Sequence, residues 1–225
     1  MNRTSILMTF ATLALFVCAT ARTSLGAIAY DNDTTAPNQF YGNSLGLDFN
    51  VNKDIYVGAL GAYFGNTISN LAGVSPNELG VDVGIYQFDS NASTWSLVSP
   101  LVHFTPSVYD STVKGDAFIN IPTLHLSVGN YSVVAFNDTN YNSNGSPNGT
   151  STTNDDGGAI TFVGGGRYGV DTVNFPTIPD GGPTNRYDAG TFQYSTTPEP
   201  ATLAIWGCGA FGFAVAAYRR RKLAV

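Results

Sequence analysis

The chain has 225 residues, with 16 acidic and 10 basic side chains and a formal net charge of −6 at pH 7. Six of the ten basic residues lie near the two ends, so residues 28–197, called the body below, hold 15 acidic and four basic side chains. Phosphate binding requires clustered lysine and arginine, so we expect no nucleic-acid partner. The body is long enough for one domain with its own core.

The N-terminal segment has the pattern of a secretory signal peptide. Arg3 is followed by an apolar stretch at residues 6–18, and small residues come next. Two positions satisfy the small-residue cleavage rule, one after Ala19-Thr20-Ala21 and one after Leu25-Gly26-Ala27. We prefer the second position, which gives a signal peptide of residues 1–27.

Short strands separated by polar turns are predicted throughout the body. Apolar and polar residues alternate, or β-branched and aromatic residues gather, at residues 45–51, 54–64, 81–88, 97–104, 117–121, 131–136 and 188–194. The pattern predicts an all-β body, an antiparallel β-sandwich of jelly-roll-like form over residues 28–194, in preference to a barrel. Residues 195–197 are interpreted as a linker. Both cysteines lie outside the body, which must therefore be held by packing or bound ions.

The segment 137–183 is rich in Asn, Ser, Thr, Gly and Asp and is predicted to be a long loop. Residues 157–163 could form a strand within it, which Gly164-Gly165-Gly166 would end. Four aromatic residues are spread over this region and its end: Tyr141, Tyr168, Phe175 and Tyr187. They are candidates for stacking on sugar rings, and the alternative is that they cover the edge of the core.

No catalytic residue is predicted. The two histidines, His103 and His125, lie within alternating strand patterns and are expected to face solvent or a partner. No HExxH motif occurs in the chain. The body is therefore interpreted as non-enzymatic, and a cryptic hydrolase is the less favoured alternative.

Calcium is the one cofactor hypothesis that the residues suggest. Asp31, Asn32 and Asp33 offer three oxygen-bearing side chains in a row, and residues 154–156 (Asn-Asp-Asp) form a second cluster. Neither cluster has the spacing of an EF-hand loop, and the alternative is that both cap turns.

The C-terminal segment predicts a single membrane-spanning helix. Pro198-Glu199-Pro200 precedes 18 uncharged residues, 201–218, which as a helix span roughly 27 Å, close to the hydrocarbon thickness of a bilayer. Arg219, Arg220, Arg221 and Lys222 follow directly and are expected to stay on the cytoplasmic side.

This tail is similar to the PEP-CTERM sorting signal of exported bacterial proteins: a Pro-Glu-Pro tripeptide, a membrane helix and a basic cluster, here residues 198–222. The resemblance implies recognition by an exosortase, which would cut near the tripeptide. The body loosely resembles an exported β-sandwich ectodomain that begins with a Tyr-Asp-Asn stretch, here Tyr30-Asp31-Asn32.

Together the two resemblances imply an exported, non-enzymatic surface or extracellular-matrix protein. It would be anchored in the membrane by its C-terminal helix until processing, with extracellular polysaccharide as a further expected partner. A carbohydrate-binding module is the main alternative.

Overall fold

The computed structural model describes residues 26–31, 41–65, 80–137, 142–143, 152–153, 155–182 and 184–197. All regular structure within these ranges is β-strand, so the prediction of an all-β body is confirmed. Residues 1–25 of the predicted signal peptide and the whole predicted sorting signal, 198–222, lie outside the described residues. Within the described residues no helix is long and apolar enough to cross a membrane.

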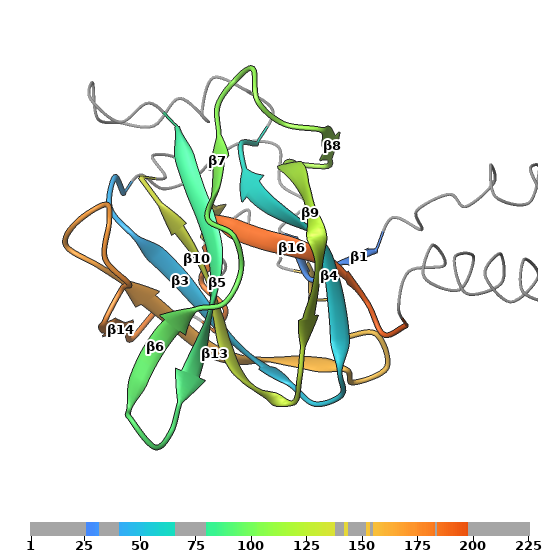
Figure 1. Cartoon of the computed structure of the whole chain (residues 1–225). Helices are drawn as coiled ribbons and strands as arrows, with labels where there is room; N and C mark the ends of the chain where they lie inside the picture. Colours follow the sequence, from blue (N-terminus) through green and yellow to red (C-terminus); the bar gives the residue numbers. More distant parts are fainter. Residues whose placement is uncertain are drawn as a thin grey trace, which may run out of the picture. The chain divides into compact units, whose positions relative to one another are not determined.

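Two curled antiparallel sheets dominate the body (Figure 1). One has five strands in the order β1-β16-β4-β9-β8: Ala27–Ile28, Gly190–Ser195, Ile55–Tyr63, Asp116–Leu126 and Ser111–Val113. The other has the order β14-β13-β3-β10-β5-β6, with β7 also paired to β5: Ile178–Asp180, Ile160–Tyr168, Leu45–Val51, Gly129–Phe136, Val81–Asp89, Thr94–Leu97 and Val102–Phe104. Two short ribbons pair β11 (Asn142–Ser143) with β15 (Tyr187–Asp188) and β12 (Thr152–Thr153) with β2 (Tyr30–Asp31).

Period-two alternation gives each main sheet one apolar face, and both faces contribute to one core. In β3 the residues Leu45, Leu47, Phe49 and Val51 are at most 1% exposed, while the residues between them point to the other face. The rings of Phe49 in β3 and Phe192 in β16 lie 4.9 Å apart, which links the seven-stranded sheet to the five-stranded one. The face of the seven-stranded sheet that points away from this core is called the outer face below.

The predicted strand 97–104 is wrong in its extent, because the structure has two strands there. β6 ends at Leu97 and β7 begins at Val102. Between them the Ile85 N–H donates a hydrogen bond to the Ser99 hydroxyl, and Pro100 has no N–H to continue the ladder.

The prediction of one long loop over 137–183 is also wrong in part, since β13 and β14 lie inside it. β13 continues through the glycine run that was expected to end it. Phe162 pairs with Phe49 and Gly166 with Leu47, so the extra residues form a bulge, and Gly164 adopts a φ of 83° that glycine tolerates. The ladder therefore resumes after the bulge, and β13 reaches Tyr168.

The connection at residues 169–177 folds over the outer face. A Cβ placed on Gly46 of β3 would lie 3.1 Å from Pro176, so the connection packs closely on the sheet. The carboxylate of Asp171 accepts two backbone N–H bonds within the connection, at 3.0 and 2.7 Å, and fixes its turn. The turn holds Phe175 against the sheet at the site described next.

Candidate functional site

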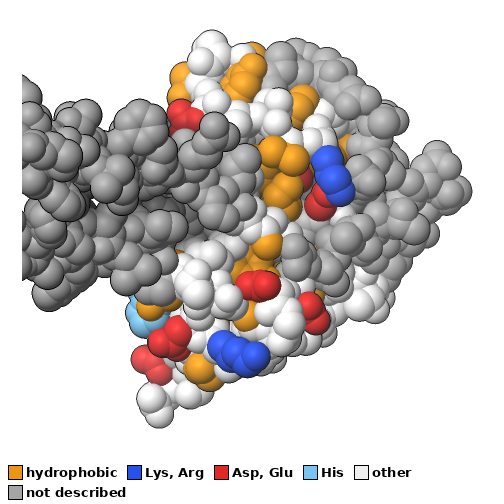
Figure 2. Space-filling model, turned by 90° about the vertical axis from the view of Figure 1, so that its right-hand side faces the viewer, with side chains coloured by type: hydrophobic (Ala, Val, Ile, Leu, Met, Phe, Trp, Pro, Cys, Tyr) orange, Lys and Arg blue, Asp and Glu red, His pale blue; other side chains and the backbone are white. Residues whose placement is uncertain are grey.

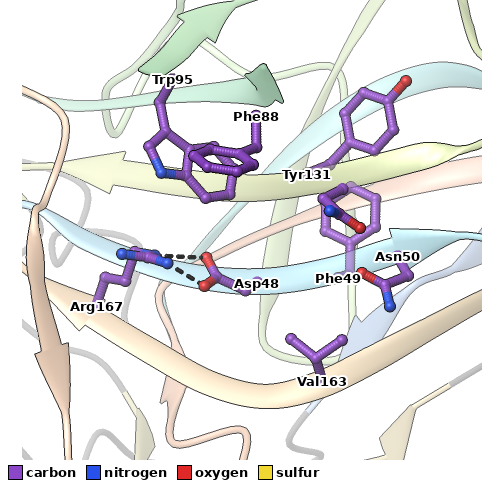
Figure 3. A pocket seen from close by; sticks show the side chains of 9 residues that line it. Asp48, Phe49, Asn50, Phe88, Trp95, Tyr131, Val163 and Arg167 are labelled. Atoms are coloured by element: carbon purple, nitrogen blue, oxygen red, sulfur yellow. Dashed lines mark hydrogen bonds and ion pairs between the residues drawn. The ribbon is translucent and has the colours of Figure 1, made fainter. Parts of the chain in front are cut away.

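A cleft of about 370 Å³ opens on the seven-stranded sheet and is called the first cleft below (Figure 3). It is lined by Asp48, Phe49, Asn50, Phe88, Trp95, Asn130, Tyr131, Val163 and Arg167. These residues come from β3, β5, β6, β10 and β13, so the cleft depends on the whole sheet.

Strand alternation explains why polar side chains reach the first cleft. Asp48 and Asn50 occupy the positions of β3 between its core residues. Asn130 of β10 is the register partner of Asn50, so two amide side chains lie side by side. Phe88 and Trp95 are register partners across the β5–β6 hairpin, which brings two aromatic rings together at the other side of the cleft.

Asp48 and Arg167 form an ion pair at the floor of the cleft. The Arg167 Nε donates to both carboxylate oxygens of Asp48, at 3.0 and 2.8 Å, and the two side chains are 23% and 13% exposed. Burial raises the pKa of Asp48 above its ordinary value, and the Arg167 charge opposes that rise. Both of these hydrogen bonds come from Nε, so within the described residues the two terminal nitrogens of Arg167 make no hydrogen bond and are available to a ligand.

An aromatic wall flanks this ion pair. The Trp95 ring lies 5.1 Å from Phe88 and 4.8 Å from Phe175, with the latter pair stacked at 17°. The Cζ atom of Arg167 lies 5.0 Å from the centre of the Trp95 ring, within cation–π distance. Tyr86 extends the wall at 5.0 Å from Phe175. The guanidinium is therefore oriented by a carboxylate and by an aromatic face.

The combination of polar and aromatic side chains in the first cleft suits a ligand that carries many hydroxyl groups on an apolar ring. Amide groups can donate to and accept from hydroxyls, a guanidinium can donate to them, and half-buried aromatic rings offer apolar contact. Glycoside hydrolysis requires two carboxyl groups on either side of the scissile bond, whereas the described lining of the cleft contains one, Asp48, which is already paired.

The basic side chains of the body do not gather into a patch within the described residues. Lys114, Arg167 and Arg186 each pair with an aspartate, and Lys53 lies 3.4 Å from the carbonyl oxygen of Gly157. On the face shown in Figure 2, the Lys and Arg side chains that are coloured stand apart from one another, and acidic side chains lie among them.

Both histidines lie where the sequence predicts, on solvent-facing strand positions. The His103 side chain is 52% exposed and its Nδ1 lies 2.8 Å from Asp82. The His125 side chain is 48% exposed and its Nε2 lies 3.0 Å from Asp54. Neither histidine lines the first cleft.

The structure describes only part of the two candidate calcium clusters. Asp31 is 5% exposed and its carboxylate lies 2.5 Å from the Lys114 amine. Asn32 and Asp33 lie outside the described residues. In the second cluster, Asp156 accepts a hydrogen bond from a threonine hydroxyl at 3.1 Å. Among the described residues no group of three His, Cys, Asp or Glu side chains is placed to hold a metal ion.

Three of the four aromatic candidates lie in two places. Phe175 belongs to the aromatic wall of the first cleft. Tyr168 and Tyr187 line a separate cleft of about 260 Å³, called the second cleft below. Tyr141 lies outside the described residues.

Sequence reasoning missed the central residues of the first cleft: Asp48, Phe88, Trp95 and Arg167. Two signals were present in the sequence. Asp48 is the one charged residue in an otherwise uncharged alternating strand, LGLDFNV, and Arg167 is one of only two arginines in the body. Their pairing joins residues 119 positions apart, which no local pattern reveals.

No protein-family model matches this chain, and no curated protein matches it. Among solved structures, a protein from Sulfurospirillum deleyianum is similar at a TM-score of 0.27 and 8% identity, over 51% of this chain and 86% of that chain. A second similar structure, of infectious bursal virus derived T=1 particles, has a TM-score of 0.24 and 12% identity, over 80% of this chain and 42% of that chain. Scores this low give no information on the fold or function of this chain.

Proposed function

We propose that this chain is an exported, non-enzymatic surface or matrix protein whose body binds neutral extracellular polysaccharide through the first cleft. One observation carries the proposal: the first cleft combines an aromatic wall around Trp95 with hydrogen-bonding groups from Asn50, Asn130 and Arg167. The excess of acidic side chains in the body disfavours acidic glycans, because like charges repel.

The body is proposed to be a β-sandwich of jelly-roll-like form. Residues of both main sheets contribute to one core, and the chain passes from one sheet to the other between β3 and β4, β4 and β5, β7 and β8, and β9 and β10. Such repeated crossing between two antiparallel sheets is typical of sandwiches. A sandwich would support the cleft on a rigid sheet.

Export and anchoring are proposed from the sequence of the two ends. Residues 201–218 would cross the inner membrane, and an exosortase would act near Pro198-Glu199-Pro200. Replacing this tripeptide with three alanines should leave full-length protein in the membrane fraction of an exosortase-bearing host. Surface protein of unchanged mature mass from that variant would contradict the sorting proposal.

The pairing of β1 with β16 bears on where the signal peptide is cleaved. Ala27 pairs with Tyr194 of β16, and a Cβ on Gly26 would lie 2.7 Å from the Tyr194 backbone, so both residues belong to the folded body. This contact supports cleavage after Ala21 over cleavage after Ala27. Mass spectrometry of the exported protein distinguishes a chain that starts at Arg22 from one that starts at Ile28.

Glycan binding can be tested by affinity electrophoresis of the full-length chain in a non-glycosidic detergent, through gels that contain hydroxyethylcellulose, dextran or alginate. We expect retardation by at least one neutral polymer and none by alginate. Trp95→Ala should weaken that binding about tenfold, which corresponds to about 1.4 kcal/mol. Tyr109→Ala is the matched control, because Tyr109 is 38% exposed and lines neither cleft.

The absence of retardation in every gel, or equal retardation of the Trp95→Ala variant, would refute the binding proposal.

Binding of calcium by the body also stays a prediction. A calcium titration that raises the melting temperature in the millimolar range would support it, and an unchanged melting temperature would remove it.

A further inference from the structure

The second cleft repeats the chemistry of the first with different residues. It is lined by Tyr41, Tyr168, Asp180, Arg186 and Tyr187. The Arg186 Nη1 donates to both carboxylate oxygens of Asp180, at 3.0 and 2.9 Å, and the two side chains are 26% and 12% exposed. The Cζ atom of Arg186 lies 5.5 Å from the centre of the Tyr187 ring. A guanidinium is again fixed between a carboxylate and an aromatic ring.

Two further tyrosines complete the wall of this cleft. The rings of Tyr41 and Tyr168 meet edge to face with centres 6.1 Å apart. The Tyr41 hydroxyl donates a 2.6 Å hydrogen bond to the carbonyl oxygen of Gly169, which fixes the position of its ring. A Cβ on Gly166 would lie 3.0 Å from the Tyr187 ring, so glycine at this position lets the ring pack against β13. The wall is therefore held in place without a ligand.

The two clefts lie on opposite faces of the same strand. Arg167 and Tyr168 are consecutive residues of β13, and consecutive side chains of a strand point to opposite faces. Arg167 lines the first cleft and Tyr168 lines the second. A short oligosaccharide bound on one face cannot fill the other, so the clefts would be separate binding sites.

We propose that the second cleft is a second saccharide-binding site, and that the body is bivalent and joins two polysaccharide chains. This inference rests on the proposed function, because it assigns to the second cleft the same class of ligand. Two sites on one rigid body increase the strength of attachment to a polymer without any new contact at either site. They also allow one molecule to cross-link a matrix.

Isothermal titration calorimetry of the full-length chain, in a non-glycosidic detergent, tests this with cellohexaose and isomaltohexaose. We expect two binding sites per chain for the hexasaccharide that binds. Trp95→Ala and Tyr168→Ala should each leave one site, the two substitutions together should leave none, and Tyr109→Ala should keep both.

Because Tyr168 also packs against the core, Arg186→Lys is a second test. It retains a positive charge opposite Asp180 but removes the planar group above Tyr187, so it should also reduce two sites to one at an unchanged melting temperature. A single site in the unmodified chain, lost in Trp95→Ala and kept in both second-cleft variants, would overturn bivalency and leave the proposed function intact. No binding of either hexasaccharide together with no retardation in any polymer gel would instead refute the proposed function.

Discussion

Substitution of Arg167 by methionine should destabilise the body in a manner that depends on pH. Methionine retains much of the side-chain volume against Trp95 but leaves the Asp48 carboxylate, 13% exposed, without its counter-charge. Removal of one partner from a buried ion pair costs about 3–5 kcal/mol. Because this pair keeps some contact with solvent, we expect a loss of about 2 kcal/mol at pH 7.

The pKa of Asp48 sets the pH window of this effect. Burial already raises that pKa above the ordinary 3.8, and removal of Arg167 raises it further. The folded state of Arg167→Met then binds a proton more tightly than the unfolded chain does, so its stability is greatest below pH 3.8 and is lost as pH rises through the folded pKa. The difference between Arg167→Met and the unmodified body should therefore be small near pH 3.5 and large at pH 7.

Urea unfolding of residues 26–197, followed by circular dichroism at pH 3.5, 5 and 7, measures this difference. Asp48→Asn combined with Arg167→Met should recover part of the stability at pH 7, because no unpaired carboxylate remains. The same loss of stability at all three pH values would show that Arg167 acts through its packing on Trp95, and would refute the electrostatic reasoning.

Three further substitutions, with Leu101→Ala as a control, test the core and the connection over the outer face. Phe192→Ala removes a fully buried ring and should cost about 3–5 kcal/mol in urea unfolding, whereas Leu101→Ala, at a side chain 49% exposed, should change stability by no more than about 0.5 kcal/mol. Gly61→Ala places a Cβ 2.6 Å from a ring of β9 and should lower the melting temperature, with a cost of about 1–3 kcal/mol. Asp171→Ala removes the acceptor of two backbone hydrogen bonds and should increase proteolysis of the connection at residues 169–177.

Each of these outcomes has a clear opposite. A loss of stability under 1 kcal/mol for Phe192→Ala would contradict the packing of Phe192 between the two sheets. An unchanged melting temperature for Gly61→Ala would mean that β4 and β9 are further apart at Gly61 than in this structure. Hydrogen bonds hold the pKa of Asp171 below 3.8, so its stabilisation is present above pH 3.8 and is lost as pH falls through the folded pKa. Asp171→Ala and the unmodified body should therefore be cleaved at similar rates well below that pKa, and a persistent difference there would contradict this assignment.

The strands with one apolar face were the most predictable part of the fold. β3 matches the predicted range, residues 45–51, because its alternation is strict. β9 runs on to Leu126, past the predicted end at residue 121, because Pro122 lies in a bulged part of the strand where the register with β4 shifts. β13 was cut short in the prediction because three glycines indicate a break, although here they form a bulge.

The candidate site was less predictable, for a topological reason. Trp95 and Phe88 face each other across a hairpin, and such a local pair can be read from the sequence. Asp48 and Arg167 meet only because β13, which follows β10 by more than 20 residues in the chain, pairs with β3 on the side opposite to β10. Phe175 reaches Trp95 through a connection whose path depends on Gly46 and Pro176. These contacts follow from strand order, which the alternation of residues does not specify.

The place of β16 within its sheet also governs when the five-stranded sheet can be completed. Among the described strands it is the last in the chain, yet it lies between β1 and β4, so within the described residues β1 has no neighbour until Gly190–Ser195 is available. Pairing of strands so distant in the chain is intrinsically slow. When the chain becomes available from its N-terminus, the five-stranded sheet thus stays incomplete until residue 195 has emerged, although β4 can already pair with β9.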